Sequence, residues 1–551
     1  MAFRDGELIV QELGSKSYKH RDDEDLARHG KKQRFQVWMV SLIFLLWKWA
    51  KQRKRNFGFL SMLGFTTTMM CTWEACQSHR DASRRPCDTG LRIPILLLQQ
   101  PRWLRWRQCA KLLGLIDLVT KANGIHRAPT SSGQYHWVAM LAPKSQAVFL
   151  SWVTGWLDMI GWWANTAAGV YFGATVTQGL LVLNYPDYTF ERWHGTLLMF
   201  AALAVCVVIN SVGSKFLPRA EGLILILHVM GFFAVLIPLV YMAPHQNAEF
   251  VFGSFINSSG WSNPGLTWLI GLMGTNLPFI GYDGPCHMAE EVVNASTIVP
   301  WCMISTILLN GALGFAIVLA FLFCIGDMSV LESPTGYDFI EVFFNATKSH
   351  AGTSVMTAIP IVLVICASFG FLASASRLTW AFARDKGLPF ADFLAHVNSG
   401  SGLPIPAVLL CAIITGLICV INVGSTAAFN AIISLTTAGL FASYEIAIVL
   451  MVIKKIKNEN IQYGPWILGR FGIIINISSI CFLTITIFFS FFPASLPVTP
   501  ENMNWSAVVF LGELSLGLFW YAVWGRKVYH GPIVETDVVP VGGDFAFGLR
   551  G

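Results

Sequence analysis

Residues 278–285 place two glycines, two prolines and the carboxylate of Asp283 inside an otherwise apolar segment. In a lipid bilayer, an interruption of this kind frees backbone N–H and C=O groups, which persist only where protein or a hydrated cavity supplies partners. Freed backbone beside a half-helix end is one way in which membrane proteins bind a charged substrate near the midplane. Because an ionisable group is costly to bury in a membrane, Asp283 favours a functional site over a Pro-Gly kink that only shapes packing.

Two further carboxylates, those of Asp158 and Glu74, also lie in apolar segments. We expect proton-coupling or gating roles for Asp283, Asp158 and Glu74, since burial and nearby charges control when a carboxyl group takes up a proton. The structural alternatives stay open: Asp283 could cap its interrupted helix through local backbone bonds, and Glu74 could face an aqueous mouth. The spacing along the chain identifies no partner for Asp158.

The loop at residues 287–291 is expected to close the cytoplasmic end of the interrupted helix. Within it, His287 and Glu291 have the i,i+4 spacing of two metal ligands, but the sequence offers no third ligand, so we predict no metal and no cofactor. Four tryptophans crowd another segment, where they could form a cage for a quaternary ammonium or serve as packing and interface anchors. They are Trp152, Trp156, Trp162 and Trp163.

The elements that must position these residues are membrane helices. The chain has 551 residues, of which 54% are hydrophobic and 13% charged, and its mean hydropathy is +0.55. Soluble proteins have about 25% charged residues, so the composition predicts an all-α polytopic membrane protein. The net charge of +6 comes mostly from tails and loops and gives no reason to expect a nucleic-acid partner. The twelve cysteines lack metal-site spacing and are expected as packed free thiols.

Apolar segments of roughly 20 residues are needed to cross a bilayer. We place the first at residues 57–75. Others follow at about 146–183, 195–213, 220–242, 264–284, 301–325, 355–383, 405–423, 427–453, 466–492 and 505–524. Residues 1–56 form a cytoplasmic tail that contains an anomalous apolar insertion at about 34–52. Residues 57–525 form the membrane domain, and residues 526–551 form a second cytoplasmic tail.

Basic residues cluster in alternate loops, which the positive-inside rule places in the cytoplasm. The clusters include Lys215 with Arg219, Arg384 with Lys386, Lys454 with Lys455, and Arg526 with Lys527. The opposite loops carry glycosylation sequons at Asn257, Asn345 and Asn504. Residues 76–127 break the pattern, because they are rich in arginine and contain no segment that could span. The charge alternation nevertheless requires one more crossing before residue 145.

The two interrupted segments also suggest an internal repeat. Aligning Gly64 with Gly281 places Glu74 and Glu291 ten residues after their respective glycines. Two Gly- or Pro-interrupted segments at corresponding positions of two halves are typical of inverted-repeat transporters.

Several long stretches carry a family resemblance. They are FGFLSMLGFTTTMMCTWEA at 57–75, APTSSGQYHWVAMLAP at 128–143, FIGYDGPCHMAEEVVNASTIVP at 279–300, the stretch ending at Asp327, and SRLTWAFARDKGLPF at 376–390. Residues 57–75 and 128–530 thereby resemble the amino acid–polyamine–organocation superfamily, in its fungal amino-acid, GABA and choline permease branch. The resemblance implies a twelve-helix fold with a five-plus-five inverted repeat and unwound helices 1 and 6. The family's second helix would fill residues 76–127, where this sequence departs from the pattern.

The resemblance also implies a substrate site. The substrate carboxylate would rest on the broken first helix at Gly64, Phe65, Thr66 and Thr67, and its ammonium would meet carbonyls of the broken sixth helix. The residues of that second set are Phe279, Ile280, Gly281 and Tyr282. Helix ends suit these charges, because unpaired N–H groups attract anions and C-terminal carbonyls attract cations.

We therefore expect a proton-coupled importer of a small amino or quaternary-ammonium compound, located in the plasma membrane. A permease-like nutrient sensor is a first alternative, although the tails show no long folded extension. A non-functional product of a disrupted permease gene is a second, because of residues 76–127. An enzyme is not expected, since no nucleophile–base pair or cofactor motif occurs. Amino acid, GABA and choline all fit as substrates.

Overall fold

The computed structural model describes residues 57–75, 130–213, 216–253, 257, 259–327, 330, 333–399, 401–459, 461, 471–493, 495–500 and 503–533. These residues are almost entirely helical, and their only β feature is an isolated bridge between Phe57 and Val292. Among them, nine helices are long and apolar enough to cross a membrane. They are α7 (Ala147–Asn184), α8 (Arg192–Ser211), α9 (Leu217–Met242), α13 (Ala295–Cys324), α15 (His350–Arg384), α17 (Ile405–Gly424), α18 (Thr426–Ile456), α19 (Gly472–Ser490) and α20 (Ser506–Trp520) with its continuation to Val528.

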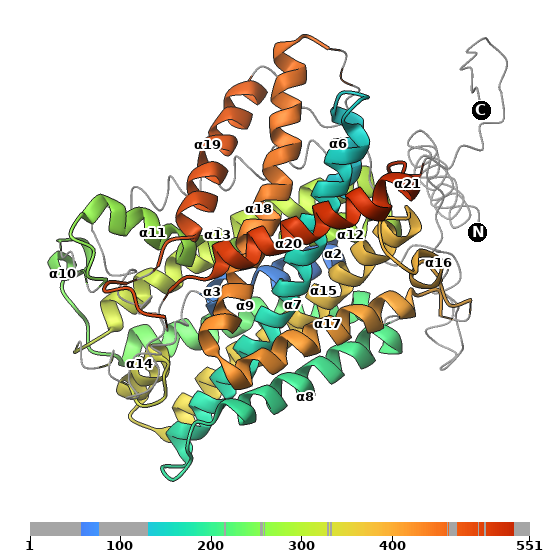
Figure 1. Cartoon of the computed structure of the whole chain (residues 1–551). Helices are drawn as coiled ribbons and strands as arrows, with labels where there is room; N and C mark the ends of the chain where they lie inside the picture. Colours follow the sequence, from blue (N-terminus) through green and yellow to red (C-terminus); the bar gives the residue numbers. More distant parts are fainter. Residues whose placement is uncertain are drawn as a thin grey trace, which may run out of the picture.

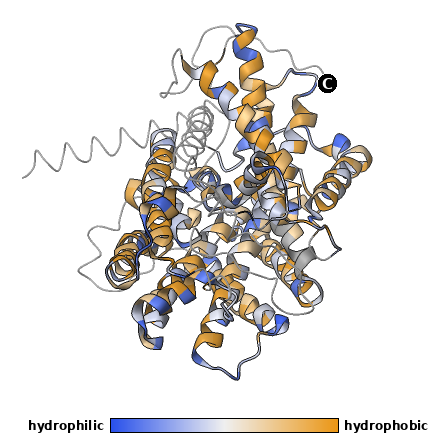
Figure 2. Ribbon diagram, turned by 90° about the vertical axis from the view of Figure 1, so that its left-hand side faces the viewer, coloured by the Kyte–Doolittle hydropathy of each residue, from blue (hydrophilic) through white to orange (hydrophobic). Residues whose placement is uncertain are grey.

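The bundle has a packed interior and an apolar outside. In α18, 67% of the most apolar stretch is buried, whereas in the helix that contains α20 only 11% is. Helices α7 and α15 pack against each other at the centre, and α9 turns Leu223, Met230 and Tyr241 outward. Figure 2 shows hydrophobic residues along most of the helices. An outer surface of this composition suits lipid and confirms a polytopic membrane protein.

Short helices mark the two ends of the bundle. At the right of Figure 1 lie α16 (Ala391–Leu394) and α21 (Arg526–Val528), and at the left lie α10 (Ala248–Gly253) and α14 (Asp338–Thr347). The basic clusters next to α16 and within α21 therefore share one end, while the sequons at Asn257 and Asn345 belong to the other. This separation agrees with the charge pattern, and the end with α16 and α21 is hereafter the predicted cytoplasmic end.

The first interrupted helix breaks later than expected. Helix α2 runs without interruption over Phe59–Met70, and the break falls at Cys71, whose φ of 44° is left-handed, before α3 (Thr72–Ala75). The predicted interruption at Gly64 is therefore wrong. Gly64 instead lets α9 approach closely, because a Cβ there would lie 2.2 Å from the backbone oxygen of Glu221. The alignment of Gly64 with Gly281 consequently fails, and Cys71 is the residue that marks the break of the first half.

The second interrupted helix breaks where the sequence predicts. Helix α11 (Pro264–Asn276) passes into the 3-10 turn η2 (Leu277–Phe279), and the chain is then non-helical until α12 (Gly284–His287). Gly281 has a φ of 97°, a conformation that favours glycine. A second 3-10 turn, η3 (Ala289–Glu291), leads to α13. The span predicted at 264–284 is thus a half-helix followed by a break.

Helix α6 (Gln134–Leu141) was not anticipated as a separate element. It packs against α7 and α18 at the predicted cytoplasmic end. Residues 1–56 and 76–129 lie outside the described residues, and so do the predicted insertion, the arginine-rich block and the additional crossing. Of the second tail, residues 526–533 are described, and Tyr529 within it is fully buried against the membrane domain.

Candidate functional site

The two helix breaks meet at the centre of the bundle. The hydroxyl of Thr72, the first residue of α3, donates to the carbonyl of Pro278 in η2 at 2.8 Å. On the other side of the break, a Cβ on Gly281 would lie 3.6 Å from the backbone oxygen of Met69. Helices α2 and α11 both end here, so their C-terminal carbonyls and negative dipole ends converge on one region. The junction is suited to a positively charged group.

A cluster of three ionisable side chains lies beside the second break. His287 Nε2 is 3.7 Å from Asp283 Oδ2 and 3.9 Å from Asp158 Oδ2, and all three side chains are fully buried. Asp158 comes from α7, so the cluster joins the broken helix to the central helix of the bundle. Two of the three predicted coupling carboxylates are thereby brought together.

Neutral groups hold the cluster in place. Gln134 Nε2 in α6 donates to Asp283 Oδ2 at 2.6 Å, and the hydroxyl of Ser443 in α18 is 3.5 Å from Asp158 Oδ1. His287 Nδ1 is 3.2 Å from the backbone oxygen of Ser131. Sequence reasoning missed Gln134, Ser131 and Ser443, because only tertiary packing brings them to Asp158 and Asp283.

The donor atoms of this cluster also have a spacing that metal ions use. One oxygen each of Asp158 and Asp283 and one nitrogen of His287 lie within 4.8 Å of one another. The pair considered from the sequence does not form, because Glu291 Oε1 accepts from Arg377 Nε at 2.9 Å instead of facing His287. The absence of a metal stays a prediction.

The third predicted coupling carboxylate, Glu74, lies apart from the cluster. Its Oε1 is 2.8 Å from His228 Nδ1, and His228 Nε2 is 3.1 Å from Asn310 Oδ1. Asn310 Nδ2 in turn donates to the backbone oxygen of Thr67 at 2.9 Å. This chain of buried bonds connects α3, α9, α13 and α2, so Glu74 does not face an aqueous mouth in this structure.

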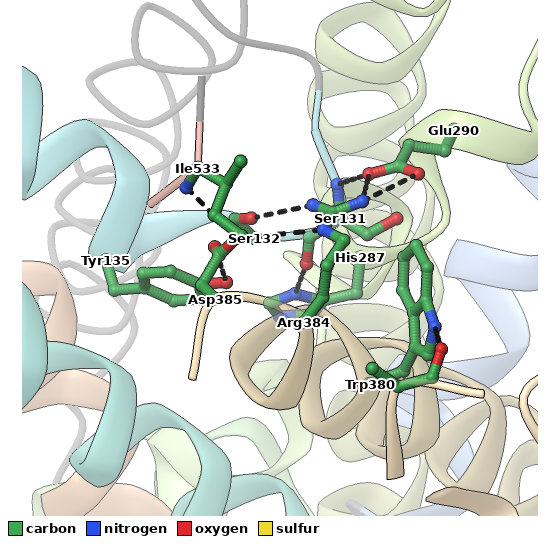
Figure 3. A network of polar contacts seen from close by, with 10 residues as sticks. Ser131, Ser132, Tyr135, His287, Glu290, Trp380, Arg384, Asp385 and Ile533 are labelled. Carbon is green, nitrogen blue, oxygen red and sulfur yellow. Dashed lines mark hydrogen bonds and ion pairs between the residues drawn. The ribbon is translucent and has the colours of Figure 1, made fainter. Parts of the chain in front are cut away.

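A buried ion-pair network lies at the predicted cytoplasmic end and includes the loop at 287–291, whose role in closing this end stays a prediction (Figure 3). Glu290 Oε1 lies 3.3 Å from Arg384 Nη1 and accepts a hydrogen bond from the backbone N–H of Ser131 at 3.2 Å. The guanidinium lies over the Trp380 ring at 4.5 Å. Residue Phe57, at the start of the domain, pairs with the same loop, since its N–H donates to Glu291 O at 3.3 Å and its carbonyl accepts from Val293 N at 3.0 Å.

The described part of the second tail completes this network. The backbone N–H of Ile533 donates to Asp385 Oδ1 at 3.1 Å, and the hydroxyl of Tyr135 donates to Asp385 Oδ2 at 2.8 Å. Burial and the neighbouring Asp385 carboxylate raise the pKa of Tyr135 well above its usual range, so this phenol remains a hydrogen-bond donor. Tyr529 OH is 2.7 Å from Ser151 Oγ.

The residues predicted to contact substrate fall into two groups. Phe279, Ile280, Gly281 and Tyr282 line the second break as expected, with only Phe279 half-buried and the rest buried. Gly64, Phe65, Thr66 and Thr67 lie inside α2, where N–H groups beyond the first turn bond within the helix. Their role in binding the substrate stays a prediction, but the unwound backbone expected there is found at Cys71.

The four tryptophans do not form a single cage. Trp152 Nε1 donates to Gly517 O and Trp156 Nε1 to Glu513 O, both in α20. Trp163 Nε1 is 3.2 Å from the hydroxyl of Thr379. Only Trp162 lies at the cluster, with its ring 5.5 Å from that of His287. Most of the set therefore serves packing.

Comparison with known proteins agrees with this architecture. A sequence model of the family described as "Amino acid permease" matches residues 125–512. A Macrophomina phaseolina protein named for amino acid/polyamine transport is 35% identical over 69% of this chain and 84% of its own length. The choline transporter of Saccharomyces cerevisiae is 30% identical over 73% of this chain and 71% of its own length. An amino-acid permease of Arabidopsis thaliana is 30% identical over 74% and 81%, respectively.

The matched region contains the second break, the cluster and the ion-pair network. Members of this family are transporters of small organic nutrients and not enzymes, and nine helices among the described residues of this chain are long and apolar enough to cross a membrane. The chain belongs to the amino acid permease family and is a multi-pass membrane transport protein.

Proposed function

We propose that the chain imports a small amino compound across the plasma membrane together with protons. The observation that carries this proposal is the junction of the two helix breaks, where Thr72 bonds to Pro278 and the C-terminal ends of α2 and α11 converge. Carbonyl oxygens at two helix ends offer an ammonium group both hydrogen-bond acceptors and a favourable dipole. The names of relatives, which mention amino acids, polyamines and choline, support a substrate that carries such a cation.

Coupling is assigned to Asp283, with Asp158 as its neighbour in the cluster. Asp283 is the last non-helical residue of the second break, so a change in its protonation alters the charge next to the substrate junction. A fully buried carboxylate is costly unless it is protonated or paired, which makes its proton sensitive to the conformation around it. Glu74 is the third candidate, and its coupling role is tested by comparing Glu74→Gln with Asp283→Asn.

Uptake of labelled amino acids, GABA and choline into a host that lacks its own permeases tests the proposal. We expect at least one compound to accumulate, and its uptake to rise as the external pH falls. Asp283→Asn should remove that pH dependence at an unchanged surface amount, whereas Asp392→Asn, whose side chain is exposed, should not. Normal surface expression without any uptake would instead favour the sensor or the disrupted-gene interpretation.

Competition separates the substrate classes. Choline lacks a carboxylate and places methyl groups where an ammonium would donate hydrogen bonds to carbonyls. Because three of the four tryptophans pack elsewhere, we expect excess choline to compete poorly with the preferred amino acid or GABA. Equal competition by choline would reverse this ranking.

A further inference from the structure

The position of the protons on His287 follows from its surroundings. Nδ1 faces the backbone carbonyl of Ser131 at 3.2 Å, and a carbonyl oxygen only accepts hydrogen bonds. Nδ1 therefore carries hydrogen. The ring is held firmly in this orientation, because Gly133, with a φ of 55°, approaches so closely that a Cβ there would lie 2.9 Å from His287 Cε1.

The other ring nitrogen faces two acids. Nε2 lies between Asp283 Oδ2 at 3.7 Å and Asp158 Oδ2 at 3.9 Å, and it has no hydrogen-bond partner within the described residues. In the neutral ring, the lone pair of Nε2 would point at two carboxylates in a fully buried site. That arrangement is unfavourable, because the lone pair and the two carboxylates repel one another and no water screens the repulsion. The space between the three groups is therefore a place for a positive charge.

We propose that His287 holds the coupling proton on Nε2, between Asp158 and Asp283, and that its charge state is transmitted through Ser131 to the Arg384–Glu290 pair. This inference rests on the proposed proton-coupled function and adds the residue that carries the proton. The sequence analysis placed His287 in the closing loop and considered it as a metal ligand, but not as a proton carrier.

The charged groups around His287 come from several elements. Asp158 faces it from α7, and Asp283 faces it from its own segment. Two arginines of α15 lie nearby and pair with acids of η3: Arg384 with Glu290, and Arg377 with Glu291. Asp385 Oδ1 lies 3.7 Å from Arg384 Nε and further compensates the positive charge of the guanidinium. Protonated His287 reduces the charge of its three-residue cluster from −2 to −1 when both acids are ionised.

Ser131 is the joint between the cluster and the closed end. Its carbonyl faces His287 Nδ1, and its N–H donates to Glu290 Oε1 at 3.2 Å. Figure 3 shows these bonds as one continuous network with Arg384 and Asp385. When Nε2 loses its proton, the ring loses its attraction for the two carboxylates. The contact between His287 Nδ1 and the Ser131 carbonyl then weakens, because a neutral ring is a poorer hydrogen-bond donor than a charged one, and Ser131 holds Glu290 less firmly.

Transport in proteoliposomes separates proton coupling from substrate binding. An inward gradient of one pH unit drives about tenfold accumulation when one proton accompanies each substrate molecule. We expect His287→Gln of the full chain to lose this accumulation but to retain exchange of labelled for unlabelled substrate without a pH gradient. His350→Gln, an exposed histidine at the start of α15, is the matched control and should behave as wild type.

The outcomes distinguish this inference from the proposed function. Wild-type accumulation that ignores the pH gradient would overturn proton coupling and, with it, the role of His287. A wild-type response that persists in His287→Gln would overturn only the role of His287. Loss of both accumulation and exchange in His287→Gln would also count against it, because a structural role explains that result.

A second readout does not require transport. Trp162 contacts the His287 ring, and a protonated imidazole quenches indole fluorescence. The fluorescence of Trp162, taken as the difference between wild type and Trp162→Phe, should therefore depend on pH. We expect this signal to change with pH in purified wild-type protein and to be independent of pH in His287→Gln. No titration in wild type, an unchanged titration in the variant, or a signal that depends on added Zn²⁺ and is reversed by a chelator would overturn the proposal.

Discussion

Each of the two interrupted helices has a buried acid next to a histidine, but the two pairs differ in geometry. Glu74 and His228 are in direct hydrogen-bond contact at 2.8 Å, and the far nitrogen of His228 is bonded to Asn310. His287 stands 3.7 Å and 3.9 Å from its two acids, outside hydrogen-bond distance. The first arrangement is a completed chain of bonds, whereas the second leaves space for a proton to be gained and lost.

The backbones at the two breaks differ in the same sense. The first break is confined to Cys71, and the hydroxyl groups of Thr66 and Thr68 bond back to carbonyls of α2. The second extends from η2 to Asp283, and the chain continues through α12 and η3 to the ion-pair network. A short, well-bonded break suits a fixed platform, and a long break linked to a closed end suits a moving part. The predictions that follow test this contrast.

Gly281→Val should have the largest effect and abolish uptake. A β-branched residue is strained at a φ of 97°, by about 1–3 kcal/mol, whatever the space around it. Cys71→Gly is the matched change at the first break, where glycine relieves a left-handed conformation, so uptake should persist. Initial rates normalised to surface protein decide the matter, and equal rates for both variants would remove the distinction between the breaks.

Removing one member of the Arg384–Glu290 pair should destabilise the protein next most strongly. Both side chains are buried, and an uncompensated buried charge costs about 3–5 kcal/mol. Arg384→Met and Glu290→Gln should each lower the thermal unfolding midpoint of the purified protein, and the double variant should recover part of the loss. Additive losses in the double variant would show that the two residues do not act as a pair.

Glu74→Gln should affect stability more than coupling. An amide at this position can still bond to His228, so we expect a loss of about 1–3 kcal/mol and a retained rise of uptake at low pH. Asp283→Asn provides the opposite pattern, with coupling lost and stability less affected. A flat pH profile in Glu74→Gln would place coupling at the first break as well.

Thr72→Val should have the smallest effect. It removes the hydroxyl that bonds to Pro278 while keeping the shape of the side chain, and a neutral hydrogen bond contributes about 1 kcal/mol. We expect the half-saturation concentration to rise by about threefold to tenfold with little change in maximal rate. A large fall in maximal rate would instead mean that this bond holds the two breaks together during the transport cycle.

The sequence predicted the second break because its chemistry is local. Prolines and glycines at residues 278–285 exclude a regular helix wherever they fold. The first break was misplaced because Cys71 carries no such signal, and Gly64, which does, serves close packing of α2 on α9. A left-handed cysteine is specified by tertiary contacts, not by its own preference.

The composition of the site was only partly accessible from the sequence. Burial of Asp283 and Asp158 could be predicted from their apolar surroundings, but their common partner could not. Asp158 and His287 are far apart in sequence. Gln134 begins a short helix that no hydrophobic period reveals, and Ser131 lies in the turn before it. Spacing rules report neighbours on one helix, whereas this cluster is assembled from three segments.

The pairing of Phe57 with residues 291 and 293 connects the start of the membrane domain to the predicted cytoplasmic end. Two backbone hydrogen bonds join Phe57, just before α2, to the loop in which Glu291 pairs with Arg377. While these bonds persist, any movement of that loop away from α15 also moves the N-terminal end of α2. Because α2 is one continuous helix that ends where the two breaks meet, a displacement of that loop would also displace the first break.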